Sequence, residues 1–371
     1  ATYTLHVDGN AGAPVLSGNV TIEGFTFADP QRLHWCIVAT DHIATGLQLT
    51  FRNNRITDGN RYGFWDYHSH GILLCENNSF SDVYYGMLLE GWDTGMVTIQ
   101  NNEFTNLHFY LDQNGVANPA FGGPVGILSM TYSAGGGVDC TNPYRIFENH
   151  FHTYANDGFG IVFNGGLTGN GTAKYTDVEI SRNTIAPGAT GTGIRLRNLP
   201  APNNSPNGGV HNAGIYNNFI SNVLFGIRLQ GDNPGTEATQ NSLVNCSTDA
   251  IENTGTALME ASCNWYGSAA AASVAPQITG NVNYQSWLVN GTDDDLVTLG
   301  FQPVSGSCTG CAQPVLQTTI NTVVVTNNNN GTDDTGSFSV CNGEDVVFDN
   351  FQDISGLSLT GLKVYQTATY T

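Results

Sequence analysis

The stretches Phe51-Arg-Asn-Asn-Arg-Ile56, Cys75-Glu-Asn-Asn-Ser-Phe80 and Ile99-Gln-Asn-Asn-Glu-Phe104 share one pattern of apolar residues around an asparagine. The second asparagine of each stretch recurs every 24 residues, and later copies follow at spacings between 23 and 47 residues. Such self-similarity predicts stacked repeats. The recurring asparagines are Asn54, Asn78, Asn102, Asn149, Asn183, Asn218, Asn241 and Asn264.

Apolar residues alternate with other residues before each asparagine, as in Leu73 and Cys75 or Val178 and Ile180. A period of two indicates strands, and Cys75 falls on an apolar column between Phe51 and Ile99. A second alternating run follows in several repeats. Each repeat therefore holds at least two short strands with no crossover helix, which predicts a parallel β-helix with strands about 4.8 Å apart. The second runs are residues 86–91, 160–165, 193–198 and 226–231.

The recurring asparagine has a physical role in such a coil. A side-chain amide offers two donors and one acceptor, so copies stacked at a bend can bond to one another and to the turn backbone. A leucine there would leave backbone groups of the bend unpaired. We therefore expect the eight asparagines to form a ladder.

The N-x-[FI] and G-I-x-L-x-G rungs resemble those of the right-handed parallel β-helix superfamily, the pectin-lyase-like and NosD-like repeat proteins. The resemblance covers roughly residues 15–290. It implies the fold and says little about function, because this fold carries lyases, hydrolases, phage spikes and adhesins.

The composition limits the partners of the chain. Its 371 residues include 31 acidic and only 11 basic side chains, for a net charge of −20. Nucleic acid and anionic membranes are poor partners for such a surface, because phosphate binding needs clustered Lys and Arg. No run of 18 apolar residues occurs, so no membrane span is predicted. The abrupt start at Ala1 and the strand-like end at 362–371 indicate a segment of a larger protein.

Three regions follow from the repeat: a parallel β-helix over 1–290, a linker over 291–307 and an incomplete Ig-like β-sandwich over 308–371. Trp265, Tyr266 and Trp287 are expected to cap the apolar end of the stack. Residues 264–288 resemble the last coil of β-helices in large secreted surface proteins of gliding-type bacteria. Residues 340–348 are similar to the start of the Ig-like modules of such adhesins, in agreement with short predicted strands after residue 315.

The cysteines outside the core indicate disulfides. Cys341 is expected to pair with Cys308 or Cys311, and Cys246 lies on the coil next to that of Cys263, where the two can pair. Zinc would need a fourth ligand that this region does not offer. The pattern favours an oxidising, extracellular setting.

Two regions interrupt the repeat, residues 108–144 and 198–213. Insertions in solenoids form loops on one face, which is often the binding face. Passive loops are the alternative interpretation.

The register also predicts columns of outward side chains. Glu237 and Glu260 should lie one strand apart, about 5 Å, which is the carboxylate separation of a retaining glycosidase. The absence of a flanking aromatic residue or arginine in register favours a solvated acidic edge instead.

Arg195 and Arg228 stack in the second strand, and Arg197 lies between Asn164 and Gln230. This cationic strip is the most lyase-like feature, because the resembling lyases use an arginine base beside a uronate carboxylate. Those enzymes also need clustered aspartates for calcium, which these columns lack. The other interpretation is a site that binds a polymer carboxylate or a neighbouring chain.

The segment Trp65-Asp-Tyr-His-Ser-His70 and Trp92-Asp93 place aromatic, histidine and acidic residues on adjacent coils. Aromatic faces suit sugar rings, and His68 and His70 alternate as two metal ligands on one strand would. A packed or exposed aromatic patch without a ligand is the alternative. The predicted glycan or partner contacts are Trp65, Tyr67, His68, His70, Trp92, Arg195, Arg197 and Arg228.

Two near-identical stretches, 290–295 and 330–335, offer oxygen ligands for calcium through Asp293, Asp294, Asp295, Asp333 and Asp334. Asp and Asn are also ordinary turn formers. No other cofactor is expected.

These observations favour an extracellular structural or adhesive segment of a large bacterial surface protein, a rod that presents surfaces to a glycan, a cell surface or sister subunits. The resemblance to type-IX-secreted adhesins and filamentous appendages implies self-assembly. The missing set of acid, base and metal argues against an enzyme. A polysaccharide lyase or glycoside hydrolase acting on acidic glycans, with Arg195, Arg228, Glu237 or Glu260 in catalysis, is the alternative.

Overall fold

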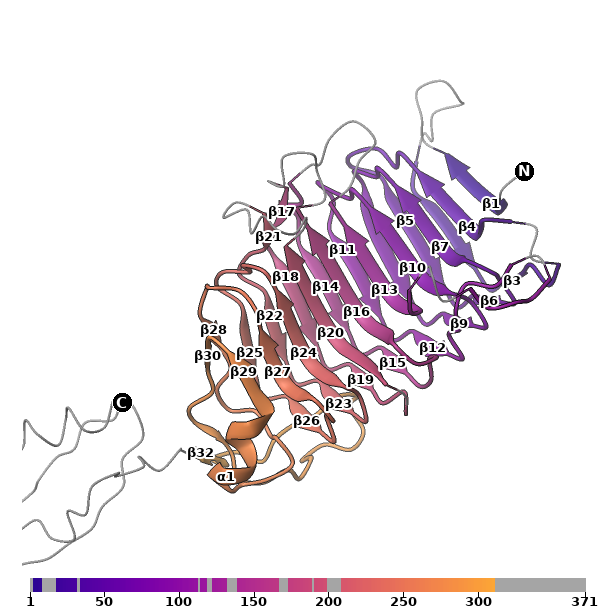
Figure 1. Cartoon of the computed structure of the whole chain (residues 1–371). Coiled ribbons are helices and arrows are strands. Elements are labelled where there is room, and N and C mark those ends of the chain that lie inside the picture. Colours follow the sequence, from indigo (N-terminus) through magenta and orange to yellow (C-terminus); the bar gives the residue numbers. More distant parts are fainter. Residues whose placement is uncertain are drawn as a thin grey trace, which may run out of the picture.

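The fold is a parallel β-helix, seen in a computed structural model that describes residues 3–8, 18–31, 34–112, 114–118, 122–131, 139–166, 173–188, 190–198 and 208–310. Each coil passes in turn through three parallel sheets, which we call A, B and C. Figure 1 shows the sheets running along one axis from the indigo N-terminal coils to the orange C-terminal ones. Three strands per coil agree with the two or more that the sequence predicts.

Each sheet grows by one strand per coil, in chain order. Sheet A contains β1 (Tyr3–Asp8), β4 (Cys36–Asp41), β7 (Tyr62–Tyr67), β10 (Tyr85–Glu90), β13 (Val125–Met130), β16 (Gly158–Gly165), β20 (Gly191–Asn198), β24 (Phe225–Gln230), β27 (Asp249–Asn253) and β29 (Ile278–Gly280). Sheet B contains β2 (Val20–Glu23), β5 (Gln48–Arg52), β8 (Ile72–Glu76), β11 (Val97–Gln100), β14 (Tyr144–Phe147), β18 (Val178–Ser181), β22 (Gly214–Tyr216), β25 (Glu237–Thr239), β28 (Met259–Glu260) and β30 (Val282–Asn283). Sheet C contains β3 (Thr26–Ala28), β6 (Arg55–Thr57), β9 (Ser79–Ser81), β12 (Glu103–Thr105), β15 (His150–Phe151), β19 (Thr184–Ile185), β23 (Phe219–Ser221) and β26 (Ser242–Val244).

The core consists of columns of apolar side chains stacked from coil to coil. Cys75 pairs in register with Phe51 and Ile99, and all three are fully buried, which confirms the predicted column. Sheet C contributes a row of stacked rings, with Phe104 lying 5.0 Å from Phe80 and 4.6 Å from Phe151 between ring centroids. Alternation along each strand directs these side chains inward.

A glycine precedes the inward apolar residue in many strands of sheet A because sheet C packs against it. A Cβ on Gly86 would lie 2.5 Å from the ring of Phe104, closer than real carbon contacts allow. The glycine of the G-I-x-L pattern therefore makes room for the ring row of sheet C.

The predicted asparagine ladder is confirmed along the whole stack. Each side-chain Nδ2 donates to the Oδ1 of the next ladder asparagine at 2.9–3.1 Å, from Asn54 to Asn264. The same Oδ1 accepts the backbone N–H of the preceding ladder residue, as Asn183 does from Asn149 at 3.0 Å. Each Nδ2 also donates to a carbonyl one coil back, such as that of Ile99 for Asn149. All eight are buried.

The bend before each ladder asparagine uses a left-handed residue, which the sequence analysis did not identify. The φ angles of these residues lie between 53° and 58°, a region that asparagine tolerates better than most residues. The residues are Asn53, Asn77, Asn101, Glu148, Arg182, Asn217, Gln240 and Cys263.

The two predicted insertions occupy defined corners. The first, 108–144, is split by β13: residues 106–124 connect sheet C to sheet A, and residues 131–143 connect sheet A to sheet B. The second, 198–213, also connects sheet A to sheet B. At this corner β17 (Lys174–Tyr175) pairs in parallel with β21 (Gly209–Val210). Insertions in the second half of the stack thus emerge along one edge of sheet A.

The C-terminal end of the stack is capped as the sequence predicts. Tyr266 and Trp287 are each about 1% exposed, and the Trp287 indole donates to the Ala269 carbonyl at 3.1 Å. A short helix α1 (Ala271–Val274) and a 3-10 turn η2 (Ala275–Gln277), neither of them predicted, precede the last strands.

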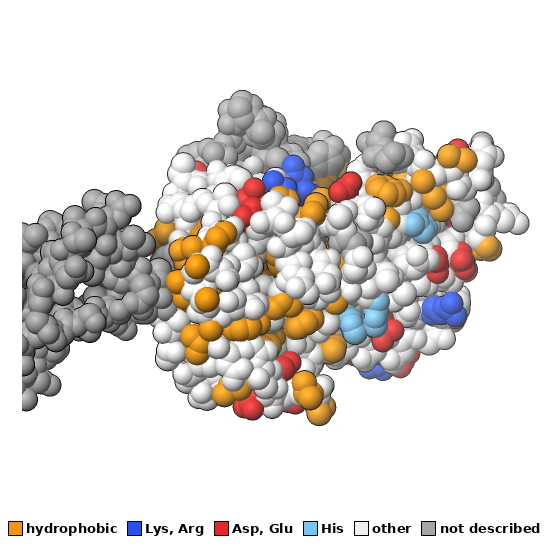
Figure 2. Space-filling model, turned by 60° about the horizontal axis from the view of Figure 1, so that its bottom comes forward, with side chains coloured by type: hydrophobic (Ala, Val, Ile, Leu, Met, Phe, Trp, Pro, Cys, Tyr) orange, Lys and Arg blue, Asp and Glu red, His pale blue; other side chains and the backbone are white. Residues whose placement is uncertain are grey.

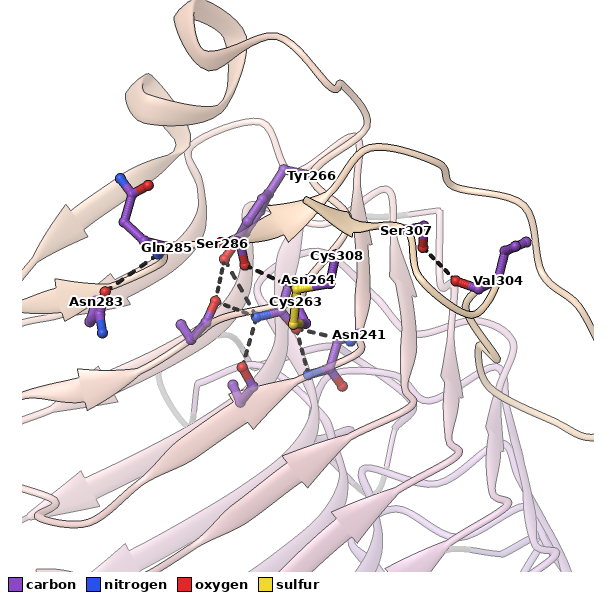
Figure 3. The surroundings of a disulfide bond; sticks show 12 residues. Asn241, Cys263, Asn264, Tyr266, Asn283, Gln285, Ser286, Val304, Ser307 and Cys308 are labelled. Carbon is purple, nitrogen blue, oxygen red and sulfur yellow. Dashed lines mark hydrogen bonds between the residues drawn. A yellow bond between two sulfur atoms is a disulfide. The ribbon is translucent and has the colours of Figure 1, made fainter. Parts of the chain in front are cut away.

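One disulfide ties the cap together, and its pairing corrects the sequence prediction. Cys308 bonds to Cys263, so the predicted pairs Cys308–Cys341 and Cys246–Cys263 are wrong, and Cys246 is free. The other predicted pair, Cys311–Cys341, lies outside the described residues. Cys263 is the left-handed residue of the last ladder turn, and its sulfur meets β32 (Cys308–Gly310), which is antiparallel to β31 (Trp287–Leu288). Figure 3 shows the disulfide beside Asn241 and Asn264, at the end of the ladder. Stacking alone does not specify this pairing because it depends on how residues 289–307 fold back.

The predicted linker 291–307 contacts the β-helix. The Phe301 N–H donates to the Asn217 carbonyl at 2.8 Å, and Phe301 is about 1% exposed. The predicted Ig-like sandwich, with Cys311, Cys341, Asp333 and Asp334, lies outside the described residues. Among the residues that the structure describes, no helix is long and apolar enough to cross a membrane.

Candidate functional site

The outer face of sheet A carries the most varied set of side chains on the β-helix. Register pairing places one outward residue of each strand in a central column. From β4 to β27 this column reads Ala39, Trp65, Leu88, Leu128, Val162, Arg195, Arg228 and Glu252. Its chemistry thus changes from aromatic to aliphatic to charged along the axis.

The middle of this face is apolar although it points away from the core. Leu88, Val125, Leu128 and Val162 form a cluster separate from the core, and each is at most 6% exposed. We call these four residues the apolar strip. Half-buried large side chains pack around the strip, namely Tyr62, Trp65, Tyr85, Met130 and Phe159. On the face shown in Figure 2, uncharged side chains predominate and basic ones are few.

Three arginines follow the apolar strip in the next two coils. The Arg195 guanidinium lies 3.8 Å from the centroid of the Phe159 ring, and that of Arg228 lies 4.1 Å from the Phe225 ring. Arg228 forms an ion pair with Glu252. The predicted stacking of Arg195 under Arg228, with Arg197 between Asn164 and Gln230, is confirmed by the register.

Arg195 and Arg197 differ from Arg228 because neither has a carboxylate partner among the described residues. The Nε atoms of both are buried without a hydrogen bond. Burial, and then the charges of Arg197 and Arg228, lower the pKa of Arg195 to about 9. Burial and Arg228 also lower the pKa of Arg197. Two partly buried cations therefore stand next to one another, a costly arrangement that a bound anion would relieve.

One acid borders the aromatic end of the face. The Trp65 indole N–H donates to Glu90 Oε2 at 3.0 Å. Burial raises the pKa of Glu90, and this hydrogen bond opposes the rise. Glu90 is thus held by Trp65 at the opposite end of the apolar strip from the arginines.

Together these side chains offer both parts of a site for an acidic sugar polymer. The half-buried aromatic side chains around the apolar strip can pack against the apolar faces of sugar rings, and guanidinium groups bind carboxylates through paired hydrogen bonds. The site is an open surface, and in the described chain no group of three or more His, Cys, Asp or Glu residues is arranged to hold a metal ion.

The predicted aromatic and histidine cluster is only partly on this face. Trp65 and Tyr67 point outward on β7, but Trp92 is fully buried and donates from its indole to the Gly71 carbonyl, so its predicted role as a contact residue is wrong. The expectation that His68 and His70 share a strand face is also wrong. Strand β7 ends at Tyr67, and His68 has a left-handed φ of 57°.

The histidines instead lie at the corner after sheet A. His70 Nδ1 is 2.5 Å from Asp93 Oδ1, and His68 stacks on Tyr67 with ring centroids 4.0 Å apart. Burial and the neighbouring His42 and His70 lower the pKa of His68. This corner is a packed polar cluster beside the outer face of sheet A.

Glu237 and Glu260 are paired in register on sheet B, as predicted. Asn283 Nδ2 donates to Glu260 Oε2 at 2.7 Å. Arg145, in the same column, is three coils from Glu237 and bonds Asp177 at 2.7 Å. The structure therefore places the two carboxylates together but away from the arginines of sheet A.

Asp293 and Asp295, proposed as calcium ligands, accept hydrogen bonds from nearby residues of their own loop. Asp293 Oδ1 accepts the backbone N–H groups of Asp295 and Gln302 at 3.2 and 3.1 Å. Asp295 accepts the N–H of Val297 and the hydroxyl of Thr298. These bonds lower the pKa of Asp295. The turn-forming interpretation accounts for these contacts.

The apolar strip was missed by reasoning from sequence, although a signal for it exists. Leu88 and Val162 occupy the same position within the G-I-x-L pattern as Arg195 and Arg228. Alternation assigns that position to the outside, so an aliphatic residue there marks an outward apolar surface.

Comparison with known proteins gave no match: no family model, curated protein or solved structure is similar to this chain at a significant level.

Proposed function

We propose that this chain is an extracellular structural and adhesive segment of a large bacterial surface protein, and that the outer face of sheet A binds an acidic polysaccharide. The observation that carries the proposal is the pair Arg195 and Arg197, partly buried and without carboxylate partners among the described residues, beside the apolar strip. A polymer carboxylate would supply the missing partner, and its sugar rings would pack on the half-buried rings of Tyr62, Trp65 and Tyr85 that border the strip.

The acidity of the rest of the molecule supports selectivity for such a ligand. With 31 acidic and 11 basic side chains, the surface repels polyanions in general, so a ligand with dense charge is disfavoured. A polysaccharide with one carboxylate per sugar unit can place its charges at the two arginines and uncharged ring faces elsewhere. This combination favours a uronate polymer over nucleic acid.

In this proposal the coil is right-handed, like those of the pectin-lyase-like and NosD-like proteins that its rungs resemble. Residues 308–310 belong to the cap of the β-helix, so residues 311–371 would form an Ig-like module of a type-IX-secreted adhesin or appendage, in which sister subunits make further contacts. The Cys263–Cys308 disulfide supports an oxidising, extracellular location.

The test is binding of the whole chain to polygalacturonate and alginate, with neutral dextran as control. We expect retention by both uronate polymers in affinity electrophoresis, weakening as salt is added, and no retention by dextran. The double variant Arg195→Ala/Arg197→Ala should bind at least about tenfold more weakly, since each charge-assisted hydrogen bond contributes about 1.5–3 kcal/mol. Arg55→Ala, an exposed arginine on sheet C, is the matched control.

Unchanged retention of the double variant would refute the proposed site. Equal retention by dextran would refute the role of the carboxylate.

A polysaccharide lyase is the second candidate, and the lowered pKa of Arg195 favours it. A guanidinium whose pKa is about 9 is a better proton acceptor than ordinary arginine. A lyase would produce unsaturated uronate ends from the same polymers, which absorb ultraviolet light. An increase of absorbance that disappears in Arg195→Ala would assign catalysis to sheet A, and one that disappears in Glu237→Ala would assign it to sheet B. An adhesive segment gives no increase.

A further inference from the structure

A shallow groove follows the outside of the ladder turns, between sheets B and C. At its N-terminal end it has a volume of about 360 Å³ and is lined by residues of four successive turns, among them Asn77, Ser79 and Asn101. Farther along the stack, the carbonyl of the left-handed residue Asn217 accepts a hydrogen bond from Phe301 in this groove. Within the described chain, the carbonyls of Asn53, Asn77 and Asn101 accept no backbone hydrogen bond.

At the C-terminal end the chain's own backbone occupies this groove. The Gly300 N–H donates to Thr184 Oγ1 at 3.1 Å, and the Phe301 N–H donates to the Asn217 carbonyl at 2.8 Å. The Asn217 side chain completes the contact by donating from Nδ2 to the Phe301 carbonyl at 3.0 Å. One asparagine and one hydroxyl thus bind a short, bent peptide segment through its backbone.

The position that Gly300 occupies in this contact accepts only glycine. Gly300 has a φ of +90°, and a Cβ on it would lie 2.2 Å from the Asn217 carbonyl oxygen and 2.6 Å from the Arg182 Cα. Both obstacles are backbone atoms that cannot move aside. Any other residue at this position would lose the contact.

The same pair of binding groups, an asparagine and a hydroxyl, recurs at the N-terminal end of the groove. Asn217 precedes ladder Asn218, and Thr184 follows ladder Asn183 one coil earlier. In the same relation, Asn101 precedes ladder Asn102, and Ser79 follows Asn78 one coil earlier. Asn101 has a φ of 53°, against 56° for Asn217, so the two turns share one backbone conformation.

The receptor groups at this second position are free. Asn101 is exposed, whereas Asn217 is half-buried under residues 300–302. Neither the Asn101 amide nor the Ser79 hydroxyl forms a hydrogen bond within the described chain. Arg55 and Glu103, of opposite charge, flank Ser79 on sheet C, so the site has little net charge. Recognition here would rest on a peptide backbone and not on charge.

We propose that Asn101 and Ser79 form a binding site for a glycine-containing segment of a second protein, bound as residues 300–301 are bound at Asn217 and Thr184. The glycine of the partner lies against the Asn101 turn, and the N–H and carbonyl of the next residue pair with the Asn101 carbonyl and amide. The site is independent of the outer face of sheet A and of any glycan.

The test uses a fluorescent peptide with the sequence of residues 298–303, Thr-Leu-Gly-Phe-Gln-Pro, added to the whole chain. We expect saturable binding by fluorescence anisotropy, and at least about tenfold weaker binding of the peptide with alanine in place of glycine. Ser79→Ala should weaken binding about threefold to tenfold. Ser79→Thr should bind like the wild type, because threonine is the corresponding residue, Thr184, in the site that residues 300–301 occupy. Asn101→Ala should weaken binding further, with thermal melting as the check on folding.

Three results would overturn the proposal. They are no saturable binding, equal binding of the alanine peptide, or binding that is unaffected by Ser79→Ala and Asn101→Ala. If Asn217→Ala alone abolished binding, the peptide would be exchanging with the chain's own segment, which also contradicts a second site.

Discussion

The asparagine ladder and the outer face of sheet A are built by the same stacking and use it in opposite ways. In the ladder one residue type repeats eight times, because each buried amide needs an identical neighbour above and below to satisfy its donors and acceptor. On the outer face the central column changes from Trp65 through Leu128 to Arg195. Buried polar columns must repeat, whereas outward columns are free to vary and so to acquire a binding function.

The largest effect is expected from breaking the ladder in its middle. Asn149→Leu would remove donors to Ile99, Phe147 and Asn183 and the acceptor for Asn102, which leaves several buried backbone and amide groups unpaired. At about 1–3 kcal/mol for each unpaired group, we expect a loss of about 3–5 kcal/mol in urea unfolding. Gln100→Leu, on the outward side of β11, is the matched control and should change stability little. Equal effects of the two substitutions would contradict the comparison.

A second test concerns Asp66, a buried acid that, unlike the ladder asparagines, does not have all its hydrogen-bonding atoms paired. It accepts hydroxyl hydrogen bonds from Thr40 and Ser69 at 2.5 and 2.6 Å on one oxygen, and its other oxygen is buried without a hydrogen bond to any described residue. Burial raises the pKa of Asp66 from 3.8 to about 7. Because the folded pKa lies above the unfolded one, the stability that this group contributes is complete below about pH 4 and is lost as the pH rises toward 7.

Asp66→Asn keeps the shape and removes the titration. We expect the variant to match the wild type near pH 4 and to exceed it by up to about 4 kcal/mol near pH 8, from about 1.4 kcal/mol per pKa unit. The difference between the two proteins in thermal unfolding, followed across pH, is the readout. A difference that does not change with pH would show that Asp66 is not protonated in the folded protein.

The third test asks whether the ladder depends on its cap. The disulfide Cys263–Cys308 closes a loop with a sequence separation of 45 residues, so replacing both cysteines with serine should cost about 2–4 kcal/mol. Reducing agent should bring the wild type to the same stability as the variant. A variant as stable as the oxidised wild type would mean that Tyr266 and Trp287 hold the end of the stack without the disulfide.

The smallest effect, with the opposite sign, is expected on the outer face. Arg195→Met removes a partly buried cation that has no carboxylate partner among the described residues and should raise stability by about 1 kcal/mol. Arg182→Met is the matched control, because Arg182 bonds Glu148 at 2.8 Å and its loss should be neutral or slightly destabilising. A stability loss in Arg195→Met would indicate a structural role and weaken the proposed binding site.

The contacts predicted correctly from the sequence join equivalent positions of successive coils. The ladder, the Phe51–Cys75–Ile99 column and the pairs Glu237–Glu260 and Arg195–Arg228 are all set by register, and register follows from the repeat. Sequence reasoning failed for Trp92 and for His68 with His70, because they lie at corners, where the period-two rule ends with the strand. The cap pairing of Cys263 failed for the same reason.

The sequence alone determined the coil, because a repeated pattern of local preferences specifies which residue of one turn lies above which residue of the next. Only the tertiary structure decided how residues 299–308 return to the stack, how Arg195 reaches the ring of Phe159, and which turn carbonyls remain open. These outcomes depend on side chains and chain segments that cross the repeat. Their energies come from contacts between residues that no period relates, so no pattern along the chain encodes them.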